Sequence, residues 1–416
     1  MIRTKTLPNG VRIVTEVVDS VYSAAIDLWV EVGSAYETEF NNGVSHCLEH
    51  MLFKGTTNRT ADQIAEEMED VGGMLGAATS RELTKVYGHV LGEDIEIALD
   101  VITDMVMNPL LKDDDLALEK KVIIDEMRMY EDDPGDVAQE LVYRNLWKGY
   151  SYSLPITGTS ATVNSITTSS LRSHFERFYR PERMIVSIAG KFDEEKTIAY
   201  LTEKLAKLPG SEEKPEPITP ASRVFNIIKE RNIEQAQMIV SMEGLTQTDK
   251  RQATLSVLEL CMVASSSSRL FKEVREKRGL VYNIGGLEHS YRSCGLYGIY
   301  CATMAEHVEE VISLILAEFR RLKDEGFTAK EIERAKTQLR ADLLMDLESM
   351  PSRSTSNAAD LLYFGRTISI DECRKEIEEV TNEAVIDLAR ELFVDEKLSL
   401  VALGPKGELS RNLSLV

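Results

Sequence analysis

Cysteine is scarce in this chain of 416 residues, and no two cysteines are spaced as a CxxC motif. The five are odd in number and scattered, at Cys47, Cys261, Cys294, Cys301 and Cys373. Without a CxxC pair a thiolate zinc finger is excluded, and the pattern suits a reducing compartment. We therefore expect a cytoplasmic protein.

Long hydrophobic runs and an excess of basic residues are also missing. No apolar stretch reaches the length of a membrane span, and the N-terminal "MIRTKTLPNGVRIVTE" has no apolar h-region, so we expect neither a membrane segment nor a signal peptide. The net charge of −21 argues against nucleic acid or an anionic membrane as a partner. It favours basic ligands, although an acidic surface also serves solubility alone.

What the sequence does contain is a repeat of about half its length. "FYRPERMIVSIAGK" resembles "LFVDEKLSLVALGP", and their glycines, Gly190 and Gly404, are 214 residues apart. Glu119 and Glu333, in two similar helical stretches, are separated by the same 214 residues. A recurring offset predicts an internal duplication, whereas the alternative is a chance likeness between amphipathic helices.

The domain organisation follows from the midpoint of the chain. "LPGSEEKPEPITPAS" holds four prolines among alternating charges and is typical of a linker. We predict an N-terminal domain over 1–210, a linker over 211–222 and a homologous C-terminal domain over 223–416. In each half, strand pairs joined by short turns are grouped apart from long helices, which predicts an α+β fold with mostly antiparallel sheets.

Two of the six histidines stand close together in "NNGVSHCLEHMLFKGT", which begins at Asn41. On a helix capped by Asn41 or Asn42, His46 and His50 lie one turn apart on the same face, and Glu49 borders that face. Such a pair can hold zinc, with Glu49 as the base that activates a zinc-bound water. The alternative is a pair of hydrogen-bonded helix histidines with no metal.

A catalytic zinc site needs a third protein ligand, and acidic residues on a later helix are the candidates. Glu119 and Glu126 lie two turns apart on one face of "DLALEKKVIIDEM". Taken alone, this helix is better explained by glutamates on a solvated face.

The "HCLEH" motif followed by "MLFKGT" resembles the inverted HxxEH zinc motif of the pitrilysin and insulin-degrading-enzyme clan, and most of all its mitochondrial processing peptidase-like branch. The resemblance implies that Glu126, 76 residues after His50, is the third ligand and that Glu119 assists catalysis. It also implies one Zn²⁺ per chain and a metalloendopeptidase that hydrolyses unstructured peptides. The two domains would form half of a clamshell chamber.

Two further segments carry the resemblance. "GGMLGAATSRELTKVY" is similar to the family's substrate-binding edge strand, which places Gly76 and Ala77 on the peptide, although the family usually has Asn where this chain has Gly76. "SSRLFKEVREKRGLVY" is similar to a segment with a substrate-binding Arg and Tyr, which correspond to Arg275 and Tyr282. A solvated helix end is the alternative for this basic run.

The second half retains no metal motif, so the resemblance implies one catalytic domain and one that binds substrate. Because this branch carries two of the clan's four domains per chain, it also implies a bacterial-type homodimer with the site completed in trans. Two alternatives are a non-catalytic scaffold subunit and a subunit active only with a different partner chain. The complete zinc motif argues against the first, and the presence of Arg275 and Tyr282 in the same chain argues against the second.

Overall fold

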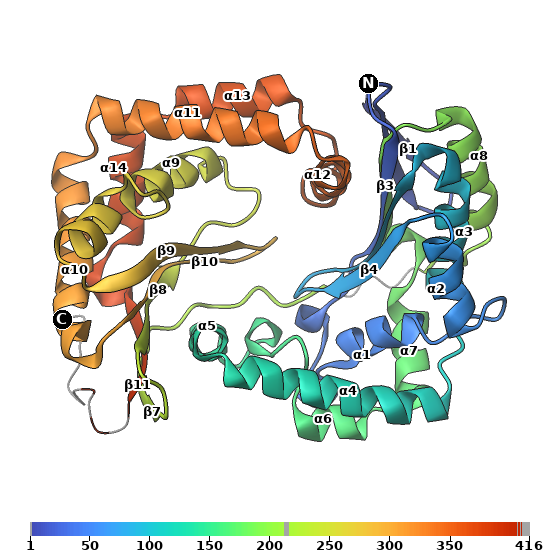
Figure 1. Ribbon diagram of the computed structural model, residues 1–416, viewed down its shortest axis with the longest axis horizontal. Coiled ribbons are helices and arrows are strands. Elements are labelled where there is room, and N and C mark those ends of the chain that lie inside the picture. The colour runs from blue at the N-terminus through green and yellow to red at the C-terminus, as the bar shows by residue number, and fades with distance from the viewer. Residues whose placement is uncertain (1, 212–215, 406, 408, 410–416) are drawn as a thin grey trace. The chain divides into compact units, whose positions relative to one another are not determined.

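The computed structural model describes residues 2–211, 216–405, 407 and 409, and its chain divides into two compact units (Figure 1). Unit 1 comprises Met1–Arg128, Leu154–Ile218 and Met345–Ile368, and unit 2 comprises Met129–Ser153, Thr219–Leu344 and Ser369–Val416. Each unit thus includes a segment from the other half of the sequence. The domain boundaries at 210 and 223, which are inferred from the sequence, stay a prediction. Residues 212–215 of the predicted linker lie outside the described residues.

Unit 1 is built on a six-stranded sheet with the order β1-β2-β6-β3-β5-β4. Its strands are β1 (Ile2–Thr6), β2 (Arg12–Val17), β3 (Ser23–Val30), β4 (Met74–Thr79), β5 (Thr84–Leu91) and β6 (Met184–Gly190). β2 and β6 run parallel, and the other neighbours are antiparallel. β4 therefore lies at an edge of the sheet, with β5 as its neighbour.

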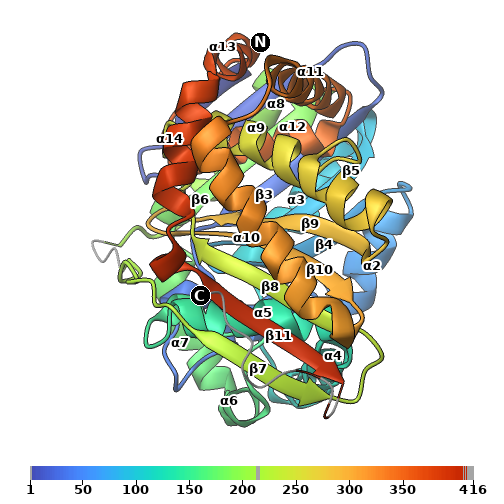
Figure 2. The same cartoon turned by 90° about the vertical axis from the view of Figure 1, so that its left-hand side faces the viewer.

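Unit 2 contains a five-stranded sheet with the order β7-β11-β8-β10-β9, which faces the viewer in Figure 2. Its strands are β7 (Asn226–Arg231), β8 (Ala236–Glu243), β9 (Val281–Ser290), β10 (Gly295–Thr303) and β11 (Ser399–Pro405). β7 and β11 run parallel, and the other neighbours are antiparallel. This repeats the order and directions of β2-β6-β3-β5-β4, which is the result that a duplicated unit predicts.

Helices pack against both sheets, so the predicted α+β class is confirmed. Unit 1 contains α1 (Val44–Leu52), α2 (Ala61–Glu69), α3 (Ile95–Met107), most of α4 (Asp113–Asp132), α6 (Ser160–Ser165), α7 (Thr168–Phe178), α8 (Glu194–Leu205) and α12 (Met350–Tyr363). Unit 2 contains α5 (Pro134–Leu146), α9 (Gln252–Met262), α10 (Val308–Glu325), most of α11 (Ala329–Asp346), α13 (Ile370–Glu379) and α14 (Asn382–Leu392). In the described part of the chain, no helix combines the length and apolar character that crossing a bilayer requires.

Short helical turns complete the fold. They are η1 (Ser34–Tyr36), η2 (Gly92–Asp94), η3 (Ser151–Ser153), η4 (Pro181–Arg183), η6 (Ala305–His307) and η7 (Asp395–Lys397), together with one π-helix, η5 (Phe271–Lys277).

The two halves of the sequence exchange one helix each. α12, from the second half, covers the face of the unit 1 sheet that carries Val14, Trp29 and Ile185. α5, from the first half, packs against β8 and β11 of unit 2. Both helices begin with proline in their first turn, where a missing N–H costs nothing.

The exchange explains why the central strands β3 and β6 are buried on both faces. Neighbouring residues of a strand point to opposite faces, so Val186 enters the core formed with α1 and α3, whereas Ile185 meets α12. Polar contacts fix the position of α12, because the Ser187 hydroxyl donates to the Ser354 carbonyl over 2.7 Å and the Ser354 hydroxyl donates to the Ser187 carbonyl over 3.1 Å.

Candidate metal centre

The helix that carries the histidine pair, α1, is held at its N-terminus by a carboxylate. Glu37 accepts hydrogen bonds from the backbone N–H of Gly43 over 2.7 Å and of Ser45 over 2.8 Å. The expected cap by Asn41 or Asn42 is wrong, because Gly43 is the N-cap residue and the Asn42 amide donates to Glu37. One carboxylate satisfies two helix N–H groups and also suits the positive end of the helix dipole.

The opposite side of α1 is part of the unit 1 core. Val44, Cys47, Leu48 and Met51 are buried there among apolar side chains. Burial raises the pKa of the Cys47 thiol to about 12, because the thiolate would lose its hydration. Cys47 is therefore a packing residue that points away from the histidine face, as its position on the helix predicts.

The structure brings the three predicted ligands together. His46 and His50 lie edge to face with ring centroids 4.7 Å apart, and α4 brings Glu126 to them. The Glu126 Oε2 atom is 3.5 Å from the Nε2 atoms of both histidines. Ligand atoms placed tetrahedrally at zinc distances are about 3.4 Å from one another, so both distances to Glu126 fit one zinc ion. Among the described residues these three are the group of His, Cys, Asp and Glu side chains that can share a metal ion.

The protonation of His46 suits metal binding. Burial and, after it, the neighbouring charge of His50 lower the pKa of His46 to about 4, although Glu126 acts in the opposite direction. His46 is thus neutral at pH 7, the form that ligates metals. Burial disfavours protonation of His50 as well, but hydrogen bonds to Glu126 and Glu119 outweigh it and raise its pKa.

Glu119 occupies a different place from Glu126, although both lie on the same face of α4. Its Oε2 atom is 3.0 Å from Nδ1 of His50, and its Oε1 atom is 2.6 Å from Nζ of Lys54. An acceptor at Nδ1 keeps the proton on that nitrogen and leaves Nε2 free to bind a metal. Glu119 therefore contacts the His50 ring from the side away from Glu126 and is not one of the three predicted ligands.

Glu119→Gln is expected to weaken zinc binding by about 10–100-fold, because the His50 ring loses a charged partner that sets its tautomer. Competition between the protein without metal and a chromophoric chelator measures the change. The matched control is Glu333→Gln at the repeat-related position, where the carboxylate contacts Arg340 on an exposed helix. Equal zinc affinity in Glu119→Gln and wild type would contradict this role for Glu119.

Glu49 stands beside the three ligand atoms without being one of them. Its side chain is buried, and its Oε2 atom accepts a hydrogen bond of 2.5 Å from the Thr79 hydroxyl at the end of β4. Burial raises the pKa of Glu49, whereas the hydrogen bond from Thr79 opposes the rise. A carboxylate with a raised pKa takes up a proton more readily, as a general base requires.

The predicted substrate-binding residues Gly76 and Ala77 lie on the edge strand β4. A Cβ atom at Gly76 would stand 2.6 Å from Cζ of Tyr87, its partner on β5, so the Tyr87 ring occupies the space over the glycine. The same arrangement recurs in unit 2, where Tyr300 lies over Gly285. A side chain at Gly76 would therefore require the partly exposed end of the Tyr87 side chain to move.

The other two predicted substrate-binding residues lie in unit 2. The Arg275 guanidinium, on the π-helix η5, stands 5.3 Å from the ring centroid of Tyr282 on β9. Tyr282 is 79% exposed. The structure brings the two side chains together and leaves the tyrosine accessible, and their contact with substrate stays a prediction.

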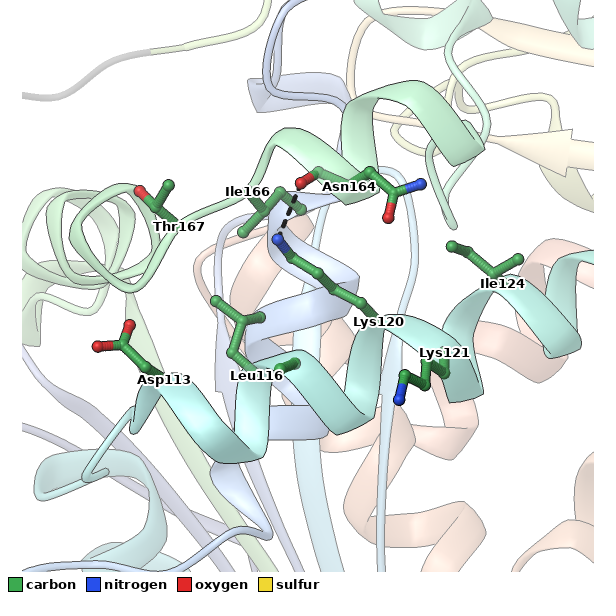
Figure 3. A pocket seen from close by; sticks show the side chains of 9 residues that line it. Asp113, Leu116, Lys120, Lys121, Ile124, Asn164, Ile166 and Thr167 are labelled. Carbon is green, nitrogen blue, oxygen red and sulfur yellow. Dashed lines mark hydrogen bonds between the residues drawn. The ribbon is translucent and has the colours of Figure 1, made fainter.

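A cavity of about 360 Å³ lies on the other side of α4 (Figure 3). It is lined by Asp113, Leu116, Ala117, Lys120, Lys121, Ile124, Asn164, Ile166 and Thr167. Lys120 donates to the Asn164 carbonyl over 2.9 Å, which ties α4 to α6. By helix periodicity these α4 residues point away from Glu119 and Glu126, so the cavity is separate from the metal centre.

Two histidine nitrogens and a carboxylate oxygen within reach of one metal ion, with the Glu49 carboxylate beside them, are a donor set typical of catalytic zinc sites. Comparison with known proteins gives the family. Residues 12–160 match the model described as "Insulinase (Peptidase family M16)", and residues 165–339 match "Peptidase M16 inactive domain". The chain belongs to the peptidase M16 family.

Relatives cover the chain almost completely. A protein of Bacillus subtilis named as an uncharacterized zinc protease is 36% identical over 98% of this chain and 100% of its own length. A similarly named protein of Streptomyces coelicolor is 35% identical over 97% of this chain and 90% of its own length.

Solved structures confirm the two-domain fold. A protease from Helicobacter pylori superposes with a TM-score of 0.91 at 20% identity, over 97% of this chain and 99% of that one. A peptidase M16 inactive domain structure from Pseudomonas fluorescens gives the same TM-score and identity over 98% and 99%.

Proposed function

We propose that the protein is a zinc-dependent endopeptidase of the processing peptidase-like branch, with one zinc per chain held by His46, His50 and Glu126. The observation that carries the proposal is the position of Glu126 Oε2, 3.5 Å from both histidine Nε2 atoms, with Glu49 outside this set. The names of the relatives as zinc proteases support the same activity.

Bound zinc would supply a Lewis acid that polarises the peptide carbonyl and acidifies water. In this proposal Glu49 takes a proton from the attacking water and later gives it to the leaving amine. Glu119 keeps the His50 ring in the tautomer and orientation that the site needs.

The proposed substrates are unstructured peptides. An edge strand binds an extended chain through its backbone, and β4, which carries Gly76 and Ala77, is such a strand in unit 1. We propose that Arg275 and Tyr282 also bind the peptide, and that two copies of the chain form a closed chamber in which each completes the other's site. The net charge of −21 favours basic peptides.

The test combines metal analysis with digestion of peptides of matched length and opposite charge, with a folded protein as control. We expect one zinc per chain, cleavage of the unstructured peptides with the basic set preferred, and an intact folded protein. Efficient digestion of the folded control would contradict the chamber, and a preference for acidic peptides would contradict the charge argument. A zinc-loaded protein that cleaves no peptide would overturn the proposed function.

A further inference from the structure

The end of strand β4 reaches the carboxylate of Glu49. Alternate residues of the strand face the α1 side, and Leu75 and Ala77 pack there against the unit 1 core. Thr79, the last residue of β4, follows in the same alternation. Its hydroxyl stands 2.5 Å from Glu49 Oε2, which is a short hydrogen bond typical of a charged acceptor.

The surrounding hydrogen bonds decide which group donates. The Thr84 hydroxyl, 3.4 Å from that of Thr79, gives its proton to the Val32 carbonyl over 2.9 Å. With the Thr84 hydroxyl turned to Val32, the Thr79 hydroxyl is the donor of the short bond to Glu49. The Oε2 atom of Glu49 therefore accepts from the threonine hydroxyl.

The turn that follows Thr79 is fixed by backbone contacts. The N–H of Ser34 donates to the Ser80 carbonyl over 3.2 Å, and the N–H of Ala35 donates to the Arg81 carbonyl over 2.8 Å. A Cβ atom at Gly33 would stand 2.2 Å from the Ser80 carbonyl oxygen, so the two segments approach as closely as glycine permits. Thr79 is therefore held in place before any substrate binds.

We propose that Thr79 is a positioning residue for Glu49, donating its hydroxyl to one carboxylate oxygen throughout turnover while the other oxygen accepts and releases the proton. This inference rests on the proposed peptidase function. The water loses a proton to Glu49 as its oxygen bonds to the carbonyl carbon. That proton passes to the leaving nitrogen as the carbon–nitrogen bond breaks, and Thr79 keeps its own proton.

The arrangement also links the base to the strand proposed to bind substrate. Thr79 ends the edge strand that carries Gly76 and Ala77, so the strand whose backbone would pair with the peptide also fixes the carboxylate. A displacement of about 1 Å in a reacting group can cost 10²-fold in rate, so this link has catalytic consequences.

The experiment compares zinc-loaded Thr79→Val, which keeps the branched shape without the hydroxyl, with Thr79→Ser, which keeps the hydroxyl. Cleavage of one unstructured peptide is followed for kcat and KM, and zinc content is measured. We expect Thr79→Val to lower kcat by about 10–100-fold with KM changed by less than about twofold. Thr79→Ser should retain kcat within about threefold of wild type.

The matched control is Thr15→Val. Thr15 is buried on β2 and donates to the Glu194 carboxylate over 2.7 Å. The Thr15→Val variant therefore loses a hydrogen bond from threonine to glutamate at a different place in unit 1. Its kcat should equal that of wild type. In a Glu49→Gln background, Thr79→Val should leave the dissociation constant for the uncleaved peptide unchanged, because the threonine acts through the base.

Several outcomes would overturn the inference: wild-type kcat in Thr79→Val, an equal loss in Thr79→Ser, or a loss explained by zinc content or KM alone. If Thr79→Val does not fold, Thr79→Ala removes the hydroxyl and is read in the same way. A wild-type protein that cleaves no peptide with zinc bound would instead refute the proposed function, and the role of Thr79 with it.

Discussion

Glu49→Gln is expected to keep one zinc per chain and to lower kcat by about 10²–10⁴-fold. The side chain lies beside the ligand atoms without belonging to them, so its charge is not needed to hold the metal. An amide of the same shape still accepts from the Thr79 hydroxyl but cannot take a proton from water. Zinc content by atomic emission and initial rates on an unstructured peptide measure the two effects separately.

Glu126→Gln is the matched comparison for this result. It makes the same chemical change at a predicted ligand, so it should release zinc as well as abolish cleavage. Near-full turnover in Glu49→Gln would show that the base is wrongly assigned, and loss of its zinc would make Glu49 a ligand.

Two inactive variants are expected to restore each other's activity when mixed. Glu49→Gln lacks the base, and an Arg275→Ala, Tyr282→Phe variant lacks the proposed substrate contacts, so each alone should be weak or inactive. If the site is completed in trans, a heterodimer of the two contains one site with every group intact. Its activity should rise to about half that of the wild-type dimer, because one of two independent sites works.

The two variants carry different affinity tags, so that heterodimers can be purified after exchange and their peptide cleavage measured. Each variant mixed with a differently tagged copy of itself is the control. Inactive heterodimers of verified composition, or an active monomer, would require the arrangement in trans to be abandoned.

The sequence predicts the histidine pair well, because positions four apart on a helix share a face whatever the rest of the fold does. It does not predict Glu126 from its own helix, where glutamates are abundant, and only the family resemblance selects it. Glu37 leaves no signal in the sequence, and Thr79 lies in the segment that resembles the family's edge strand but receives no role from it. One reaches α1 from a preceding turn, and the other meets Glu49 across 30 residues of sequence.

In the fold, too, the features that depend on neighbouring residues are predicted from the sequence, and those that depend on distant segments are not. Alternating strands and short turns predict the antiparallel pairs β4–β5 and β9–β10, and both are present. The amphipathic pattern of α5 and α12 predicts that each buries one face, but not which sheet it covers. That choice depends on contacts between segments far apart in the sequence, which a local pattern does not contain.

The exchange of α5 and α12 has a consequence for the origin of the chain. If one ancestral repeat was copied, the helix that corresponds to α5 and α12 would have covered the sheet of a second copy of the repeat. The sheet of a lone repeat would then have stayed uncovered. Such a helix-swapped homodimer depends on concentration for its stability. Fusion of the two copies would make the exchange intramolecular, and each copy could then diverge, with the metal ligands retained in one and lost from the other.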